Sequence, residues 1–305
     1  MKQAVIDIGS NSMRLTVYDI SNEHFKILFR EKDMAALAGY VENNILTQDG
    51  INRACVGLLD FKHTLKSLKI NDVYVFATAS LRNIANTDEA VRIIKEKTDY
   101  NIDVISGKLE ALLGYYGALQ SLSLKDGVFI DIGGASTEVV TFQNNDILST
   151  NSFPLGSLSL YKKCVRYILP DKESIKKINQ CIKKTIKLPG VTKTKTIVAV
   201  GGTARGILKL AKKNYGLDAL EQKITAKQFQ DLSLLLLKKD SNCASLILKI
   251  EPERIHTIIP GYMILKYLFD SFGADELIVS NYGVREGYLC QKRLPNNIHI
   301  RKTEN

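Results

Sequence analysis

The sequence predicts an α/β protein, and three observations support this class. Short apolar runs of strand length alternate with longer segments of helical apolar spacing. A motif of strand, glycine turn and strand occurs twice. The length of 305 residues suits two domains or one large one, and 45% hydrophobic and 24% charged residues are typical of an ordinary soluble globular protein.

The central motif is GVFIDIGGASTEVV at residues 127–140, which predicts two strands joined by a tight loop. Asp131 and Glu138 flank a loop of glycines and hydroxyl residues. Glycines allow backbone N–H groups to gather around an anion, and flanking carboxylates can hold a divalent cation over it. The motif therefore predicts a phosphate and metal site. An ordinary β-hairpin, in which the glycines serve only the turn, is the alternative.

The stretch AVIDIGSNSMRLTVY at residues 4–18 repeats this plan. Asp7 falls on Asp131, and Gly9 falls on Gly133. Two such half-sites can face each other across a cleft and clamp one phosphate chain. The repeat therefore favours a phosphate site over a plain hairpin.

Regular segments lie between and after these motifs. The spacing predicts helices over 52–69, around 87–98 and from 106 onward, and an amphipathic helix over 254–269 that Pro260 and Gly261 interrupt. Strands are expected over 72–78, 102–105, 196–200 and 276–280, and the polar tail from Leu294 is expected to be loosely ordered.

Two charged residues stand where ligands bind in open α/β sheets. Arg82 follows the strand that ends at Thr78, on the carboxyl side of the strand. Glu110 falls in the first turn of the helix after Ser106. Each has a structural alternative, because Arg82 could pair with a nearby acid and Glu110 could simply favour the helix dipole.

The net charge of +10 is unevenly distributed. Residues 1–120 carry a net charge of −1 and the remainder +11, and between Lys162 and Lys213 fifteen basic residues accompany only Asp171 and Glu173. A solvated helix face would explain this block, as would a track for nucleic acid, anionic lipid or polyphosphate. Few aromatic residues interleave it, which disfavours single-stranded nucleic acid.

Several classes of protein are excluded. The N-terminus has no secretory signal, and no apolar run is long enough to span a bilayer, so cytoplasmic residence is expected. Five scattered cysteines without a C-x-x-C pair, and four histidines without H-x-x-x-H, argue against zinc and a disulfide framework. Neither a G-x-G-x-x-G fingerprint nor a P-loop is present.

Taken together, the motifs resemble the exopolyphosphatase/guanosine pentaphosphate phosphohydrolase (Ppx/GppA phosphatase) family, in the short two-domain form. This family belongs to the actin, sugar-kinase and heat-shock-ATPase fold group. The resemblance covers nearly the whole chain and is carried by D-I-G-S-N-S at Asp7, T-x-S-L-R at Thr78, S-G-x-x-E-A at Ser106, D-I-G-G-x-S-T-E at Asp131, P-L-G-S at Pro154, G-G-T at Gly201 and G-V-R-E-G at Gly283.

The resemblance implies two actin-like (ribonuclease H-like) ATPase-fold domains flanking a central cleft. The first would span residues 1–120, with the segment 288–305 packing back on it, and the second would span 121–287 with the basic helical region.

The resemblance also implies roles for single residues. Glu110 would be the catalytic base, and Asp131, Glu138 and Asp7 would hold the metal. The phosphate-binding residues would be Gly9, Ser10, Asn11, Ser12, Arg82, Gly133, Gly134, Ala135, Ser136 and Thr137, with Arg14, Thr78, Gly202, Thr203, Arg285 and Glu286 as further candidates.

The chain departs from the family pattern at several positions. Lys108 and Leu109 replace acids beside Glu110, and Ala135 stands where a third glycine is usual. His256 stands two residues after Arg254, where an acid is common, and the chain ends before the extra helical domain of longer members. The departures beside Glu110 and at Ala135 predict a weak or altered catalyst.

The predicted function is Mg²⁺-dependent hydrolysis of the terminal phosphate of inorganic polyphosphate. The basic block favours this long polyanion over guanosine pentaphosphate, whose hydrolysis is the alternative. A catalytically weak sensor of polyphosphate or nucleotide is the alternative of another class. No membrane or nucleic-acid partner is expected, and a homodimer is compatible with the sequence.

Overall fold

The computed structural model describes residues 1–21, 24–188, 193–237 and 241–293. The chain divides into two compact units, which are described separately. Unit 1 comprises Met1–Glu110 and the C-terminal segment from Tyr288, and unit 2 comprises Ala111–Gly287. Each unit contains a mixed sheet covered by helices, so the predicted α/β class is confirmed.

Unit 1 is built on a five-stranded sheet of order β3-β2-β1-β6-β7. The first three strands are antiparallel, and β6 and β7 continue the sheet parallel to β1. The elements are β1 (Lys2–Ile8), β2 (Met13–Ser21), β3 (His24–Asp33), η1 (Leu37–Tyr40), β4 (Val41–Glu42), β5 (Ile45–Leu46), α1 (Gln48–Ser67), β6 (Val73–Ala77), α2 (Ala79–Arg82), α3 (Thr87–Thr98) and β7 (Ile102–Val104).

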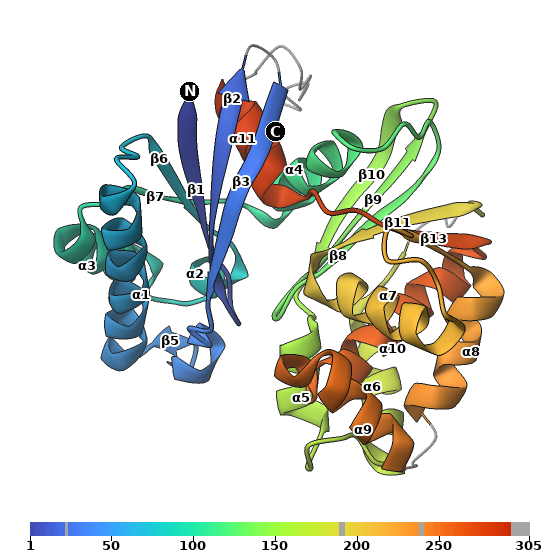
Figure 1. The fold of residues 1–305 in the computed structure, drawn as a ribbon. Coiled ribbons are helices and arrows are strands. Elements are labelled where there is room, and N and C mark those ends of the chain that lie inside the picture. Colours follow the sequence, from blue (N-terminus) through green and yellow to red (C-terminus); the bar gives the residue numbers. More distant parts are fainter. Residues whose placement is uncertain (22–23, 189–192, 238–240, 294–305) are drawn as a thin grey trace. The chain divides into compact units, whose positions relative to one another are not determined.

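Alternation along β6 divides the unit 1 core between the two faces of the sheet. Val75 and Ala77 join the cluster that contains α1 residues such as Phe61, and α1 and α3 lie side by side on this face (Figure 1). Phe76 points to the opposite face, where its ring centroid lies 4.7 Å from that of Tyr288 in α11 (Val284–Arg293). The C-terminal helix therefore completes the core of unit 1.

Unit 2 is built on a six-stranded sheet of order β10-β9-β8-β11-β13-β12. Its hairpin β8-β9 and the parallel neighbour β11 repeat the arrangement of β1, β2 and β6. The strands are β8 (Gly127–Ile132), β9 (Thr137–Gln143), β10 (Asp146–Phe153), β11 (Thr196–Val200), β12 (Lys223–Thr225) and β13 (Glu276–Val279).

Helices cover both faces of this second sheet (Figure 1). Ile130 faces a large apolar core, whereas Phe129, its neighbour on β8, packs against Tyr115 of α4 (Gly107–Leu119). The helices of the larger core are α5 (Ser157–Cys164), α6 (Lys172–Thr185), α7 (Gly201–Tyr215), α8 (Ala226–Leu237), α9 (Ser241–Ile250) and α10 (Ile258–Phe272), with η2 (Pro252–Arg254) before α10.

One helix differs from its prediction. The interrupted helix over 254–269 is wrong, because α10 begins at Ile258 and runs unbroken to Phe272. Pro260 stands in the first turn, where its missing N–H removes no intrahelical hydrogen bond.

Two further predictions concern chain segments as a whole. Within the described ranges, no helix has the length and apolar character needed to cross a bilayer. The expectation for the tail from Leu294 falls outside the described residues.

Candidate active site

The loop of unit 1 lies between β1 and β2 and spans residues 9–12. The Gly9 amide donates to the Ser12 carbonyl at 3.2 Å, which closes a tight turn. The carbonyls of Ser10 and Asn11 accept hydrogen bonds of 2.9 Å each from the amides of Ala38 and Ala36. Both loop carbonyls are therefore held by the start of η1, of which Ala36 is the N-cap.

The loop of unit 2 lies between β8 and β9 and forms the same turn. The Gly133 amide donates to the Ser136 carbonyl at 2.9 Å. Here the first turn of α5 holds the loop, since the Ser157 amide donates to the Gly133 carbonyl at 3.0 Å, and the amides of Leu158 and Ser159 donate to Gly134 at 2.9 Å each.

The backbone amides of the two loops, unlike their carbonyls, are not held by the rest of the described protein. Within the described residues, the amides of Ser10, Asn11 and Ser12 donate no hydrogen bond, nor do those of residues 134–136. Half-buried backbone N–H groups normally find an acceptor, and consecutive ones form a cradle for an anion. Each unit therefore presents a row of backbone donors of the kind that binds phosphate.

Ala135, the departure within this loop, does not strain it. Its backbone is not among the non-glycine residues at positive φ, so the Cβ requires no unusual conformation. The close approach comes instead at Gly156, the N-cap of α5, where a Cβ would overlap the backbone of Gly134 and Ala135.

Two carboxylates stand beside the unit 2 loop. Asp131 and Glu138 are directly opposite in the β8-β9 ladder, which places their side chains on one face. Glu138 is buried and accepts a 2.8 Å hydrogen bond from the Ser152 hydroxyl. A Cβ on Gly201, which has a φ of +85°, would lie 2.5 Å from Asp131 Oδ1, so this carboxylate lies at the start of α7.

The donor chemistry of this pair fits a magnesium ion. Mg²⁺ prefers oxygen ligands, and one or two protein carboxylates usually hold it together with water and substrate phosphates. Within the described ranges, no group of three or more His, Cys, Asp or Glu side chains is gathered for a metal. A cation held here would therefore complete its coordination with water and substrate oxygens.

The corresponding position in unit 1 has a different charge pattern. Asp7 stands opposite Arg14, not opposite a second acid. Arg14 Nε donates to the Ser12 hydroxyl at 3.3 Å, so this arginine reaches the loop. The register thus brings a carboxylate and a guanidinium to the unit 1 loop.

Glu110 and Arg82 are brought together within unit 1. Arg82 Nη1 lies 2.7 Å from Glu110 Oε2 and donates to the Ile105 carbonyl at 3.0 Å. The Glu110 side chain is only 10% exposed, so the ion pair is largely desolvated. Lys108, one of the departures, is exposed to solvent.

The edge of the unit 1 sheet explains why these residues are near the loop. Parallel strands β1, β6 and β7 are adjacent, and each ends at the same edge. Thr78 follows β6, where its amide donates to the Ile8 carbonyl at 3.4 Å, and Ser80 donates to the same carbonyl. The loop, Arg82 and Glu110 therefore follow three neighbouring strand ends.

The turn at the start of α7 holds two further candidates. Thr203 is buried, and its hydroxyl donates to the Ile132 carbonyl at 3.5 Å, while the Arg254 guanidinium packs directly on Gly202. Burial lowers the pKa of Arg254, although Glu251 at 3.7 Å opposes this shift. From the sequence, no role in the site was assigned to Arg254. Its packing on Gly202 is a long-range contact, which the periodicity of the sequence does not reveal.

The last two candidates lie at the start of α11. Glu286 is buried and accepts a 2.8 Å hydrogen bond from the Gly283 amide, which caps the helix. Arg285 is also buried. The hydrogen bond between Gly283 and Glu286 thus caps α11 and does not involve the loop of unit 2.

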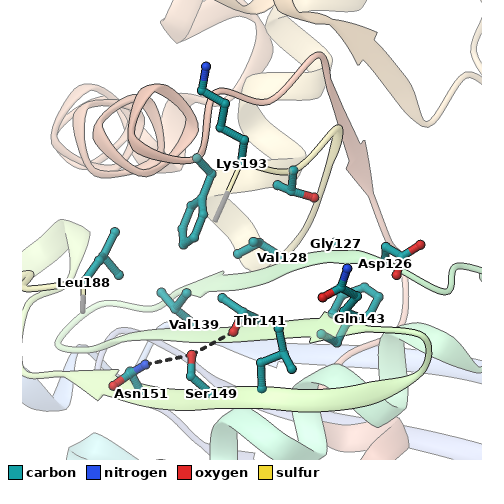
Figure 2. A pocket seen from close by; sticks show the side chains of 14 residues that line it. Asp126, Gly127, Val128, Val139, Thr141, Gln143, Ser149, Asn151, Leu188 and Lys193 are labelled. Carbon is teal, nitrogen blue, oxygen red and sulfur yellow. Dashed lines mark hydrogen bonds between the residues drawn. The ribbon is translucent and has the colours of Figure 1, made fainter. Parts of the chain in front are cut away.

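A cavity of about 220 Å³ lies elsewhere in unit 2 (Figure 2). Thr141, Ser149 and Asn151 line it and are joined by hydrogen bonds, with Ser149 accepting from Asn151 at 3.4 Å and lying 2.8 Å from Thr141. None of the residues proposed for phosphate or metal lines this cavity.

Comparison with known proteins then decides the family. The sequence pattern of the Ppx/GppA phosphatase family matches residues 16–295. The chain belongs to this family. It is a phosphoanhydride hydrolase, so the predicted family and enzyme class are confirmed.

Two relatives represent the two activities in the family name. A Haemophilus influenzae protein, provisionally named an exopolyphosphatase, is 29% identical over 302 residues, covering 94% of this chain and 90% of the relative. A guanosine-5'-triphosphate,3'-diphosphate pyrophosphatase of Pseudoalteromonas translucida is 27% identical over 98% of this chain. The chain spans only 61% of the length of that second relative.

Solved structures show the same fold. The Ppx/GppA family member of Aquifex aeolicus has a TM-score of 0.79 at 27% identity, covering 98% of this chain and 99% of that one. An exopolyphosphatase of Cytophaga hutchinsonii has a TM-score of 0.85 at 20% identity, covering 96% and 97% of the two chains.

Proposed function

We propose that this chain is an exopolyphosphatase that removes terminal phosphate groups from inorganic polyphosphate with Mg²⁺. The observation that carries the proposal is the pair of loops whose carbonyls are bound by the protein while three consecutive amides have no acceptor among the described residues. Backbone amides arranged in this way bind phosphate oxygens whatever group is attached to the rest of the phosphate chain.

The loops and Arg82 would bind the phosphate groups. Phosphoryl transfer spreads negative charge over the transferred oxygens, so positioned donors stabilise the transition state. The loop over residues 9–12 and the loop over residues 133–136 supply these donors from the backbone, and Arg82 adds a guanidinium beside Glu110.

Asp131 and Glu138 would hold the divalent cation. When bound, the cation supplies positive charge that neutralises phosphate oxygens. Ser152 fixes one oxygen of Glu138, and the start of α7 lies against Asp131. These contacts orient both carboxylates before substrate binds.

Glu110 would accept the proton of the attacking water. Its Oε2 is held by Arg82, and Arg82 is in turn held by the Ile105 carbonyl, so the carboxylate has a fixed orientation. A positioned general base typically contributes about 10²–10⁴-fold in rate. The neighbouring residues that depart from the family pattern do not displace the Glu110 carboxylate, because Leu109 is half-buried and Lys108 is exposed to solvent.

The exposed lysines of α6 support a long polyanion as substrate. Lys172, Lys176 and Lys183 are exposed and recur at helical spacing, while Ile178 and Ile182 of the same helix are buried. Opposite charge along such a face attracts a polyphosphate chain more strongly than a single nucleotide, and the attraction weakens as salt is added.

One assay separates polyphosphate from the alternatives. Phosphate release is measured with Mg²⁺ on long-chain polyphosphate and on guanosine pentaphosphate, the substrate that the Pseudoalteromonas relative's name indicates. Faster release from polyphosphate is the expected result. Faster release from the nucleotide would favour guanosine pentaphosphate hydrolysis, and binding without release would favour a sensor.

The contribution of α6 is tested by charge neutralisation. The triple variant with Lys172, Lys176 and Lys183 changed to Gln should bind long-chain polyphosphate more weakly and with a smaller salt dependence. An unchanged salt dependence would remove α6 from the substrate path.

The control for this variant removes the same charge elsewhere. Lys26, Lys66 and Lys95 are exposed lysines of unit 1, and the triple Gln variant at these positions should keep the salt dependence of the parent protein.

A further inference from the structure

Two cysteines that are distant in the sequence lie together in unit 2. Cys164 is the last residue of α5, and Cys181 lies in the third turn of α6. Their Sγ atoms are 3.5 Å apart, and both are free thiols. Because the two residues do not form a C-x-x-C motif, only the packing of α5 against α6 brings them into contact.

The geometry leaves a short path to a covalent bond. A disulfide needs a sulfur–sulfur separation of about 2.0 Å, so the two sulfurs must approach by roughly 1.5 Å. Cys164 ends its helix, and the C-cap Val165 has an extended backbone with φ −107° and ψ 126°. Cys164 can therefore move towards Cys181 by a change at the end of α5, and the helical hydrogen bonds of α6 need not break.

The two thiols differ in their access to solvent. Cys164 is 7% exposed, and burial raises its pKa to about 11, with the neighbouring Cys181 adding to the effect. The thiol form of Cys164 therefore dominates at neutral pH. Cys181 is half-buried, so it is the sulfur that a dissolved oxidant meets first. The other three cysteines, Cys55, Cys243 and Cys290, are buried, with at most 4% of the residue exposed.

We propose that Cys164 and Cys181 are a reversible oxidation site that closes to a disulfide between α5 and α6. With a peroxide as oxidant, Cys181 attacks one peroxide oxygen and becomes a sulfenic acid while water leaves. Cys164 then attacks the Cys181 sulfur, the S–S bond forms, and a second water leaves with the proton of Cys164. Two thiols are oxidised by two electrons, and one peroxide is reduced to two waters.

The cross-link reaches the phosphate-binding loop through one helix. The first turn of α5 holds the carbonyls of Gly133 and Gly134, and Cys164 is at the other end of this helix. A disulfide to α6 would fix the far end of α5 and close a short chain loop, which lowers the entropy of the unfolded state. Oxidation is therefore expected to raise the unfolding temperature of the protein, and this inference does not depend on the proposed function.

The test follows thiols in the native full-length chain. The reduced protein is treated with one equivalent of hydrogen peroxide, quenched, unfolded and titrated for free thiols. The count is expected to fall from the five cysteines of the sequence to three, and to return to five with dithiothreitol. The unfolding temperature is expected to rise by several degrees after oxidation and to fall again on reduction.

Peptide mapping locates the bond. Lys163 and Arg166 bracket Cys164, and Lys177 and Lys183 bracket Cys181. Trypsin should therefore release the peptide 164–166 linked to the peptide 178–183, with a mass two hydrogens below the sum of the two.

Matched variants distinguish this pair from the other cysteines. Cys181→Ser and Cys164→Ser should each prevent the cross-link, with Cys164→Ala as a second variant should the serine disturb folding. Cys55→Ser, which alters a buried cysteine of unit 1, should leave the cross-link and the rise in unfolding temperature unchanged. A linked peptide from another cysteine pair, a sulfinic acid on Cys181, or five remaining thiols would overturn the proposal.

Discussion

The two hairpin loops share a backbone and differ in charge. Both close with the same hydrogen bond, of 3.2 Å at Gly9 and 2.9 Å at Gly133, and in both the next three amides have no acceptor among the described residues. Across the hairpin, however, Asp7 faces Arg14, whereas Asp131 faces Glu138. The comparison teaches that the same turn can arrange backbone donors in both loops, while the residue opposite the acid sets whether a second carboxylate is present for the proposed cation.

The loops also differ in what holds them. The carbonyls of residues 10–11 are held by the N-cap and the first turn of η1, a 3-10 helix of four residues, whereas those of residues 133–134 are held by the first turn of α5, an α-helix of eight residues. A helix N-terminus adds a partial positive charge near the phosphate loop. The unit 2 loop is therefore the better candidate for the more highly charged part of the substrate.

The largest expected effect tests whether either loop can replace the base. Glu110→Gln should lower turnover on polyphosphate by about 10²–10⁴-fold, because the backbone amides proposed to bind phosphate cannot accept a proton. Binding of polyphosphate should be nearly unchanged. Steady-state phosphate release and a separate binding assay check both points, and a variant as active as the parent would remove Glu110 from the mechanism.

The charge difference between the loops is tested through the metal. Asp131→Asn should raise the Mg²⁺ concentration for half-maximal activity by at least about 10-fold, an effect seen even when outer-sphere partners of a metal are removed. Asp7→Asn should raise it less, because Arg14 and not a second acid stands opposite Asp7. Equal shifts for the two variants would contradict the assignment of the cation to unit 2.

The anchor of the unit 2 loop is tested with two glycines. Gly156→Ala should lower stability by about 1–3 kcal/mol, because the added Cβ overlaps the backbone of Gly134 and Ala135. Gly39→Ala is the control beside the other loop, since a Cβ there meets no atom within 4 Å, and its effect should stay within about 0.5 kcal/mol. Denaturant unfolding measures both values, and equal effects would show that the approach of Gly156 is not tight.

The smallest effect concerns the alanine within the loop. Ala135→Gly should leave phosphate affinity unchanged, since the Ala135 backbone already has a conformation open to any residue. Stability should fall by about 0.4–1 kcal/mol, because glycine gains entropy in the unfolded chain. A large rise in phosphate affinity would instead indicate that the Cβ obstructs the anion.

The strands beside the candidate loops could be predicted from the sequence because they are buried apolar runs. The strands β8 and β11 and the turns after them have continuous apolar residues followed by glycine, which is a local pattern. The strands β3 and β10 escaped prediction, since both lie at sheet edges and most of their residues are partly or fully exposed. A polar edge strand has no apolar run to reveal it.

The contacts between residues of the candidate site were harder to predict from the sequence than the residues themselves. The sequence placed Arg82 and Glu110 at separate strand ends, and left open whether Arg82 pairs with an acid. Their 2.7 Å contact follows only from the order of β6 and β7 in the sheet. The packing of Arg254 on Gly202 and the contact between Cys164 and Cys181 likewise depend on tertiary packing, which spacing along the chain does not encode.

The hold of α5 on the unit 2 loop has an evolutionary consequence. If backbone amides recognise the anion as proposed, the side chains of residues 134–136 need not contact it, which is consistent with an alanine at position 135. The constraint moves to Gly156 and to the first turn of α5, whose amides hold the loop carbonyls. In the proposed mode of binding, the selectivity of this loop for anions would therefore depend on residues that need never contact the substrate.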